Sequence, residues 1–146
     1  MSLLKDDATT RLDDLNLAGA EALGLYEDIG GRIDDASLSG LLAAQISTQR
    51  ALLERIADLR RARGELPHAA DPERSHLEAA EAFVRAIVLP GETETHYVES
   101  LLGAAATVGR NIDDALSLDL DGEMRALLEE LGNGNAAFEA QLRSRL

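Results

Sequence analysis

Residues 35–64 read DASLSGLLAAQISTQRALLERIADLRRARG, and this stretch decides the fold. Its apolar and amide side chains recur at alternating steps of four and three residues, which is the period of helices that pack lengthwise against one another. The positions on this stripe are Leu38, Leu42, Gln45, Gln49, Leu52, Ile56 and Leu59. Asp35 is suited to cap the helix, basic residues occupy its last turns, and Gly64 is suited to end it. The sequence therefore predicts a long helix over about 36–63.

Three further stretches carry the same helical period. They predict long helices over about 8–32, 94–117 and 122–145, the last of them interrupted by the GNGN run at 132–135. Thr93 or Thr95 is suited to cap the second of these three helices. Between the long helices, a linker containing Pro67 leads to Asp71-Pro72, a typical helix start, which predicts a short helix over about 72–89. The apolar stripes of the three long helices are Leu12, Leu15, Gly19, Ala22, Tyr26, Ile29 and Ile33; Val98, Leu101, Ala105, Val108, Ile112 and Ala115; and Met124, Leu128, Leu131, Asn135, Phe138 and Leu142.

The composition agrees with packed helices. The chain has 146 residues, enough for a single domain over 1–146, and aromatic residues make up only 3% of it. A core made of Leu, Ala, Ile and Val favours helices over a β-sandwich, and no alternating strand pattern is present. We therefore expect an all-α protein, an up-down four-helix bundle with an additional short helix in the middle connection.

The stretch LLGAAATVGRNIDDAL at 101–116 could also be a glycine-rich phosphate loop. The spacing from Gly103 to Gly109 does not match a Walker loop, no lysine follows the second glycine, and no strand precedes the first. A dinucleotide-binding loop would need a glycine where Ala105 stands. The stretch is therefore predicted to be the middle of a bundle helix with small side chains.

Charge and cysteine content exclude several classes of function. With 14 Lys and Arg against 27 Asp and Glu, the net charge is −13, which disfavours nucleic acid and acidic membrane surfaces as partners. The chain has no cysteine, so disulfides and thiolate chemistry are excluded. No signal-peptide pattern and no apolar run of membrane-spanning length is present, so we expect a soluble cytoplasmic protein.

Motifs for metal binding and catalysis are weak. ERSH at 73–76 and HYVE at 96–99 have the spacing of a Glu/His ligand pair, but both fall at predicted helix starts, where charged residues face water. No serine has the setting of a hydrolase nucleophile, and no catalytic residue is predicted. The positions expected at the centre of the bundle carry no acid and no histidine. They are Gly19, Ala22, Gln45, Gln49, Ala104, Ala105, Val108, Gly132 and Asn135.

The helix order, the DDxxLxxLL entry to the helix at 36–63 and its RRxRGE exit resemble an uncharacterised bacterial ferritin-like group, a four-helix-bundle domain of unknown function. The stretch DDALSLDLDGEMRALLEEL at 113–131 adds to this resemblance, which spans about 12–142. The resemblance implies a ferritin-like bundle. Such proteins commonly bind two metals through inward Glu and His, whereas this chain has LLGAAATVG and two glutamines at those places, so no ligand carries over.

Three hypotheses of function follow. The first is a non-catalytic ferritin-like bundle without a di-metal centre or other cofactor, which acts through contacts with itself, as a homodimer or larger oligomer, or with another protein. The second is a di-iron or di-manganese oxidase or storage protein with displaced ligands, namely Glu21, Glu54, His96, Glu99 and Glu139. The third is a small-molecule binder whose cavity is lined by Gly19, Ala22, Gln45, Gln49, Ala104, Ala105, Val108 and Asn135. Close helix approach is the alternative explanation for these small side chains.

Overall fold

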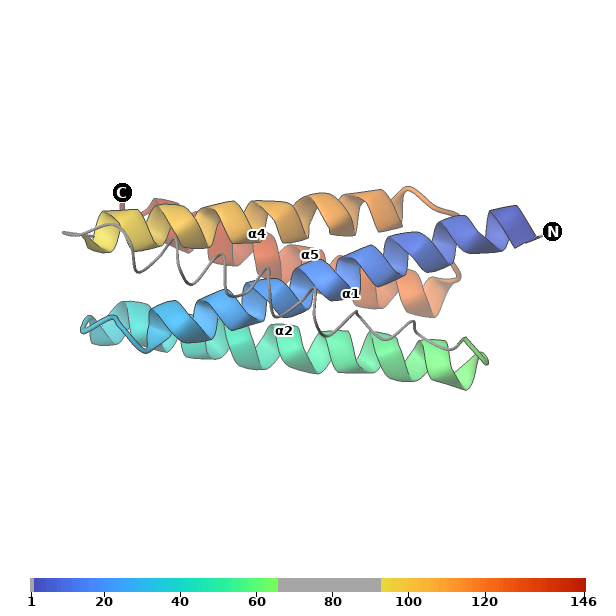
Figure 1. Cartoon of the computed structure of the whole chain (residues 1–146), viewed down its shortest axis with the longest axis horizontal. Coiled ribbons are helices and arrows are strands. Elements are labelled where there is room, and N and C mark those ends of the chain that lie inside the picture. Colours follow the sequence, from blue (N-terminus) through green and yellow to red (C-terminus); the bar gives the residue numbers. More distant parts are fainter. Residues whose placement is uncertain (1, 66–92) are drawn as a thin grey trace.

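The computed structural model describes residues 2–65 and 93–146. They form four α-helices, α1 (Ser2–Gly30), α2 (Ala36–Ala62), α4 (Glu94–Leu116) and α5 (Gly122–Arg143), which lie lengthwise beside one another (Figure 1). No strand occurs in these two ranges. None of these helices is long and apolar enough to cross a membrane. The prediction of an all-α helical bundle is confirmed.

Each helix packs against two neighbours, so that the four helices stand at the corners of a square. α1 contacts α2 and α4, and α5 contacts the same two helices. α2 ends where α5 begins, since Arg63 pairs with Asp121. α4 begins at the opposite end of the bundle, where Arg145 Nη1 lies 3.5 Å from carboxylate oxygens of both Asp35 and Glu94. The diagonal helices α2 and α4 therefore run in the same direction (Figure 1).

This chain direction differs from the expected up-down order. In a strict up-down bundle each helix would start at the end where the previous long helix stops. Here residues 66–92 connect the end of α2 to the start of α4 at the other end of the bundle. At 1.5 Å per residue α2 alone is about 40 Å long, and a connection of this length can span that distance. The bundle thus contains one long crossover connection.

The helix ends follow from local chemistry. The Asp35 carboxylate accepts hydrogen bonds from the backbone N–H groups of residues 37 and 38, and Asp121 does the same at the start of α5. Of the two threonines considered for α4, Thr93 is the cap, and its hydroxyl accepts from the His96 N–H at 3.4 Å. Gly64 follows α2 with φ +78°, a left-handed conformation that side chains other than glycine rarely adopt. The predicted caps and the predicted glycine stop are confirmed.

The predicted stripes form the core. All six stripe positions of α4 and all six of α5 are buried. On α1, Tyr26 is fully buried, and its ring meets that of Phe138 edge to face with the ring centroids 5.2 Å apart. Gln45 and Leu59 on α2 and Ile33 after α1 are only half-buried. Among the residues that the structure describes, the core is therefore aliphatic apart from one aromatic pair, which joins the diagonal helices α1 and α5.

Two predicted boundaries are wrong. α1 begins at Ser2 rather than near residue 8, because nothing in the first residues, which include neither proline nor glycine, breaks the helical period. α5 runs without interruption through the GNGN stretch at 132–135, because Gly132 packs against Ile112 and Asn135 is buried in the core. Tertiary contacts there outweigh the low helix propensity of glycine and asparagine. The predicted short helix at 72–89 and the ERSH motif lie outside the described residues.

Candidate functional site: the centre of the bundle and its outer faces

The mid-bundle positions named from the sequence come together in the interior. Six of the nine are buried, namely Gly19, Ala22, Gln49, Ala105, Val108 and Asn135. Gln45, Ala104 and Gly132 are half-buried. The polar members of this set are amides, which can donate and accept hydrogen bonds. The contacts that these amides make decide whether the centre is a cavity or a packed core.

On the α1–α2 side, Gln49 reaches from one helix to the backbone of the other. Its side chain is only 1% exposed, and Nε2 donates to the Gly19 carbonyl oxygen at 3.0 Å. Its Oε1 accepts from Gln45 Nε2 at 3.1 Å, one helical turn away. Both functional atoms of Gln49 are thereby paired, as a buried amide requires. This amide pair links α1 and α2 at a fixed register.

On the α4–α5 side, Asn135 makes the corresponding link. Its Nδ2 donates to the Ala105 carbonyl oxygen at 2.9 Å and to Glu139 Oε1 at 3.2 Å. The Glu139 side chain is only 17% exposed, and its Oε2 lies 3.2 Å from Arg143 Nη2. Glu139 therefore lies partly inside the bundle.

The ring of Tyr26 packs against Phe138, next to Glu139 in sequence. Burial in the apolar core raises the pKa of the Tyr26 phenol, and the nearby Glu139 charge raises it further. Both effects act against the phenolate. Tyr26 is therefore a neutral hydroxyl donor under all ordinary conditions, and it does not supply a base.

Small side chains at the centre allow neighbouring helices to approach closely. A Cβ atom added to Gly19 would lie 2.7 Å from Leu53 Cδ1, so that leucine occupies the space that glycine leaves. A Cβ on Gly132 would lie 3.3 Å from Ile112 Cγ2. At both glycines the structure shows close helix approach, the alternative that the sequence analysis left open beside a ligand cavity.

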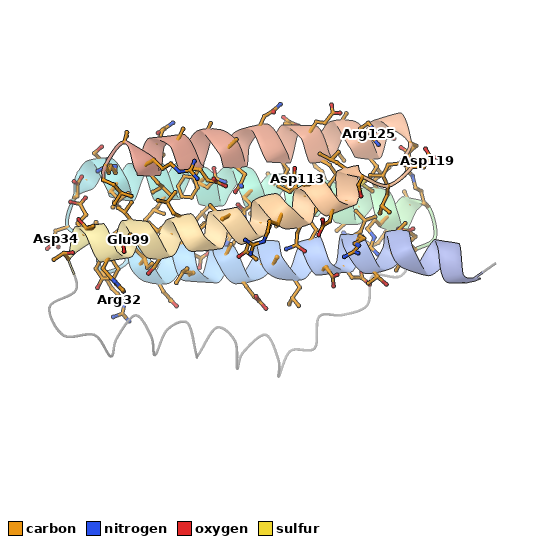
Figure 2. The ribbon with its side chains drawn as sticks, turned by 90° about the horizontal axis from the view of Figure 1, so that it is seen from above. Arg32, Asp34, Glu99, Asp113, Asp119 and Arg125 are labelled. Carbon is orange, nitrogen blue, oxygen red and sulfur yellow. The ribbon has the colours of Figure 1, made fainter. Side chains whose placement is uncertain are left out.

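The five alternative metal ligands are spread over the bundle. Glu54 and Glu99 are exposed, on α2 and α4, whereas Glu21, His96 and Glu139 are half-buried on three different helices. Glu99 lies near the start of α4, at the same end as Arg32 and Asp34 (Figure 2). Within residues 2–65 and 93–146, no three His, Cys, Asp or Glu side chains are grouped so that they could hold a metal ion. The four-ligand convergence that the di-metal hypothesis requires is not present in this part of the chain.

No known family matches this chain. Neither a family model, nor a curated protein, nor a solved structure shows significant similarity to it. The properties of a candidate site must therefore come from the chain's own residues.

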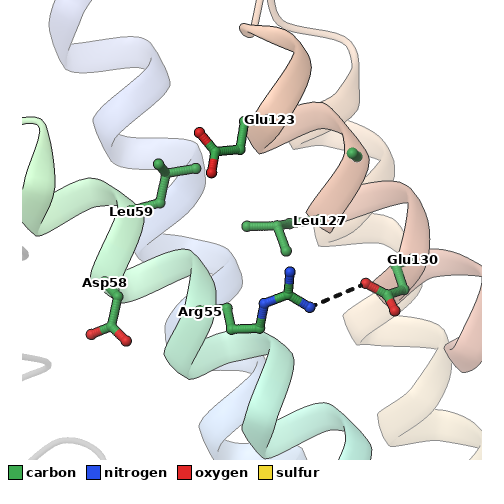
Figure 3. A pocket seen from close by; sticks show the side chains of 7 residues that line it. Arg55, Asp58, Leu59, Glu123, Leu127 and Glu130 are labelled. Carbon is green, nitrogen blue, oxygen red and sulfur yellow. Dashed lines mark ion pairs between the residues drawn. The ribbon is translucent and has the colours of Figure 1, made fainter.

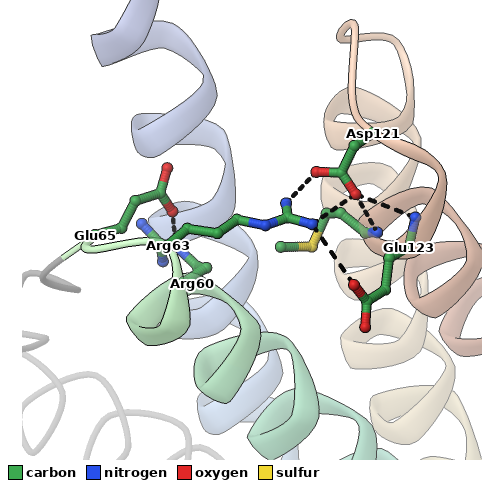
Figure 4. A network of polar contacts seen from close by, with 6 residues as sticks. Arg60, Arg63, Glu65, Asp121 and Glu123 are labelled. Atoms are coloured by element: carbon green, nitrogen blue, oxygen red, sulfur yellow. Dashed lines mark hydrogen bonds and ion pairs between the residues drawn. The ribbon is translucent and has the colours of Figure 1, made fainter.

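At one end of the bundle, an arginine of α2 and the arginine that follows this helix organise a polar network (Figure 4). Arg60 is 3% exposed, with Nη1 2.9 Å from Asp13 and Nε 3.0 Å from Glu65. Arg63 reaches across to α5, where it pairs with Asp121 and lowers the pKa of that carboxyl group. The network ties the end of α2 to α1 and α5. Arg60 stands four residues after Ile56, so the helical period places it on the buried side of α2, whereas Arg61 is exposed.

A shallow groove of about 390 Å³ lies between α2 and α5 at the same end. Leu59 and Leu127 form its apolar part, and Arg55 pairs with Glu130 across it at 3.6 Å (Figure 3). Both partners of this pair are more than half exposed, so the pair adds little to stability. The groove is open and bordered by charged side chains.

Toward the other end of the bundle, α2 and α5 each contain a segment without charged residues. Residues 36–49 of α2 contain no charged side chain, although 28% of the chain is charged. Residues 131–138 of α5 contain none either. Because α2 and α5 are antiparallel neighbours and Arg55 pairs with Glu130, the end of the first segment, near residue 48, lies beside the end of the second, near residue 137. We call this surface the small-residue face; its exposed members are Gly40, Ala43, Ala44, Ser47 and Thr48 of α2 and Asn133, Ala136 and Ala137 of α5.

Proposed function

We propose that this protein is a non-catalytic, ferritin-like helical bundle that acts through protein–protein contacts. The observation that carries the proposal is the small-residue face, whose exposed members are all uncharged although the chain has a net charge of −13. Charged residues are depleted at the centres of protein interfaces, and small side chains let another helix approach closely. The single long crossover between α2 and α4 supports the ferritin-like type, since bundles of that type have one such connection.

A second copy of this chain is the partner that the charges favour. Two copies carry the same strong negative charge and repel one another over most of their surface. Contact through the small-residue face brings together the part of α2 and α5 where this repulsion is weakest. A two-fold contact of this kind uses the same patch on both subunits. We therefore expect a homodimer in which the two faces meet.

Sedimentation equilibrium over a range of protein concentrations tests this proposal. Ala44→Glu and Ala137→Glu place charges on the small-residue face and are expected to weaken dimerisation. Ala20→Glu, at an exposed position on α1, is the matched control and is expected to leave it unchanged. Added salt should strengthen dimerisation, because it screens the repulsion between the copies. A monomer at every concentration, or dimerisation insensitive to both face variants, would rule out this partner.

The di-metal alternative is tested separately by elemental analysis of the purified protein. The centre of the bundle presents the amides of Gln49 and Asn135, which already bond to backbone carbonyl groups. Amides are also weak ligands for iron and manganese. We therefore expect less metal than protein on a molar basis. Stoichiometric iron or manganese that is lost on replacing Glu139 with Gln would instead support the displaced-ligand hypothesis.

A further inference from the structure

Two polar oxygen atoms in the core make no hydrogen bond with any residue that the structure describes. They are the Tyr26 hydroxyl and Asn135 Oδ1. Tyr26 is 0% exposed and Asn135 is 2% exposed, so bulk water does not reach either atom. Buried polar atoms in folded proteins nearly always have a partner, and each exception needs an explanation.

The two atoms have complementary roles and share a neighbour. The phenol of Tyr26 is neutral and offers an O–H donor, whereas Asn135 Oδ1 can only accept, since its Nδ2 is used by Ala105 and Glu139. Glu139 connects them, because its Oε1 lies 3.2 Å from Asn135 Nδ2 and its charge acts on the Tyr26 phenol. Phe138, between Asn135 and Glu139 in sequence, contacts the Tyr26 ring. The donor and the acceptor thus belong to the same layer of the core.

We propose that this layer is a binding site for one internal water molecule, held between Tyr26, Asn135 and Glu139. The water oxygen accepts the Tyr26 O–H bond. One water hydrogen is donated to Asn135 Oδ1 and the other to the Glu139 carboxylate. Internal waters typically make about three hydrogen bonds to buried groups that would otherwise lack partners, and this site offers that number.

A water molecule fits this site better than an ion does. The site offers a hydroxyl donor, an amide acceptor and one carboxylate, and that carboxylate is already paired with Arg143. A cation would find one charged ligand with its charge compensated, and an anion would face Glu139. A neutral molecule that both donates and accepts satisfies all three groups. The partial exposure of Glu139 provides an exchange path to solvent.

The bound water would give α1 and α5 a polar connection in addition to their aromatic contact. These helices stand on a diagonal of the bundle, and the edge-to-face contact of the Tyr26 and Phe138 rings links them in the core. Hydrogen bonds have directional requirements that ring packing lacks. The site therefore fixes the axial position of α1 relative to α5, as the Gln49 hydrogen bond does for α1 relative to α2. This role is independent of whether two copies of the chain associate.

The test compares Tyr26→Phe with Tyr97→Phe, which removes a phenol hydroxyl from a half-buried position on α4. Water oxygen-17 relaxation dispersion counts long-lived internal waters, and a high-resolution crystal structure locates them. We expect one such water beside Tyr26 in the wild-type protein and the Tyr97→Phe variant, and its loss from Tyr26→Phe. Because the variant loses a hydrogen bond, its unfolding equilibrium constant should rise about fivefold, and that of Tyr97→Phe should change much less.

A second pair of variants tests the acceptor. Asn135→Ala should also lose the water, whereas Asn133→Ala, at an exposed position on the same helix, should keep it. The proposal is overturned if the wild-type protein has no long-lived water at this place, or if Tyr26 donates directly to Asn135. It is also overturned if Tyr26→Phe is as stable as the wild type or more stable, since that result indicates a hydroxyl without a partner.

Discussion

The side chain of Leu53 occupies the place where Gly19 lacks one. A Cβ atom at position 19 would lie 2.7 Å from Leu53 Cδ1 and 3.2 Å from its Cδ2. The backbone carbonyl oxygen of Gly19 also accepts a hydrogen bond from the Gln49 side chain. Gly19 therefore sets the distance between α1 and α2 in two ways: it admits a leucine from α2, and it offers a backbone acceptor to the same helix.

Gly19→Ala is expected to destabilise the bundle, and Gly24→Ala is expected to stabilise it. Both glycines lie within α1, but no atom lies within 4 Å of a Cβ added to Gly24. Replacing an open helical glycine with alanine gains about 0.5–1 kcal/mol. At Gly19 this gain is offset by overpacking against Leu53, which costs about 1–3 kcal/mol. Chemical denaturation of the two variants measures the difference.

The steric cause can be checked with Leu53→Ala. In a double variant with Gly19→Ala, the loss of stability should be smaller than the sum of the two single losses, because the methyl groups no longer compete for space. Equal stability changes for the two glycine variants would show that Leu53 moves aside at no cost.

Arg60→Ala is expected to cost about 3 kcal/mol of unfolding free energy, the lower end of the range for breaking a buried ion pair. The Arg60 side chain is 3% exposed and pairs with two carboxylates, which would be left facing one another. Arg61→Ala is the matched control. Its side chain is 57% exposed and pairs with Asp58 within the same helix, so its loss should cost less than about 0.5 kcal/mol. Similar losses for the two variants would contradict the network at this end of the bundle.

Gln49→Glu is expected to make stability depend on pH. A protonated glutamic acid can donate to the Gly19 carbonyl oxygen as the glutamine amide does, but an ionised one cannot. Burial raises the pKa of such a carboxyl group above the unfolded value of about 4.3. The variant should therefore approach wild-type stability in acid and lose stability as the pH rises above that value. Gln141→Glu, exposed on α5, is the control and should show no such dependence.

Two helix caps are expected to weaken in acid. Hydrogen bonds from the Leu38 and Ser37 backbone lower the pKa of Asp35, and the Arg63 hydrogen bond together with the Met124 N–H lowers that of Asp121. A carboxyl group whose pKa is lower in the folded than in the unfolded state stabilises the fold. This stabilisation is fully present above the unfolded-state pKa of about 3.9, and it is lost as the pH falls through the lower folded-state pKa. Thermal unfolding of Asp35→Asn and Asp121→Asn should show a smaller loss of stability below pH 4 than the wild type. If these variants lose as much stability below pH 4 as the wild type does, groups other than the two caps cause the loss.

Much of the fold could be predicted from the sequence because the helical period is an intrinsic property of the residue order. Every position predicted for the apolar stripe is buried, both on α4, from Val98 to Ala115, and on α5, from Met124 to Leu142. Asp35, Thr93 and Gly64 mark helix ends through interactions with the nearest backbone groups. Such features depend on neighbours within one turn and require no knowledge of the rest of the chain.

The positions of charged residues inside the bundle could not be predicted in this way. Glu139 and Arg60 have charged side chains of the kind that usually faces solvent, yet Glu139 bonds to Asn135 and Arg60 is enclosed by Asp13 and Glu65. The partners of Arg60 lie on α1 and after the end of α2, whereas Glu139 bonds to residues of its own helix. Only the packing of those elements decides whether a long polar side chain reaches water or a buried partner.

The sequence by itself determined that the chain forms long amphipathic helices, where most of them end, and that the centre carries amides and small residues. The direction of α4 relative to α2, the continuity of α5 through Gly132, and the filling of the space at Gly19 by Leu53 were decided by the tertiary structure. The physical reason is the range of the interactions. Helical period and capping act within a few residues, whereas close packing and buried hydrogen bonds join side chains that are far apart along the chain.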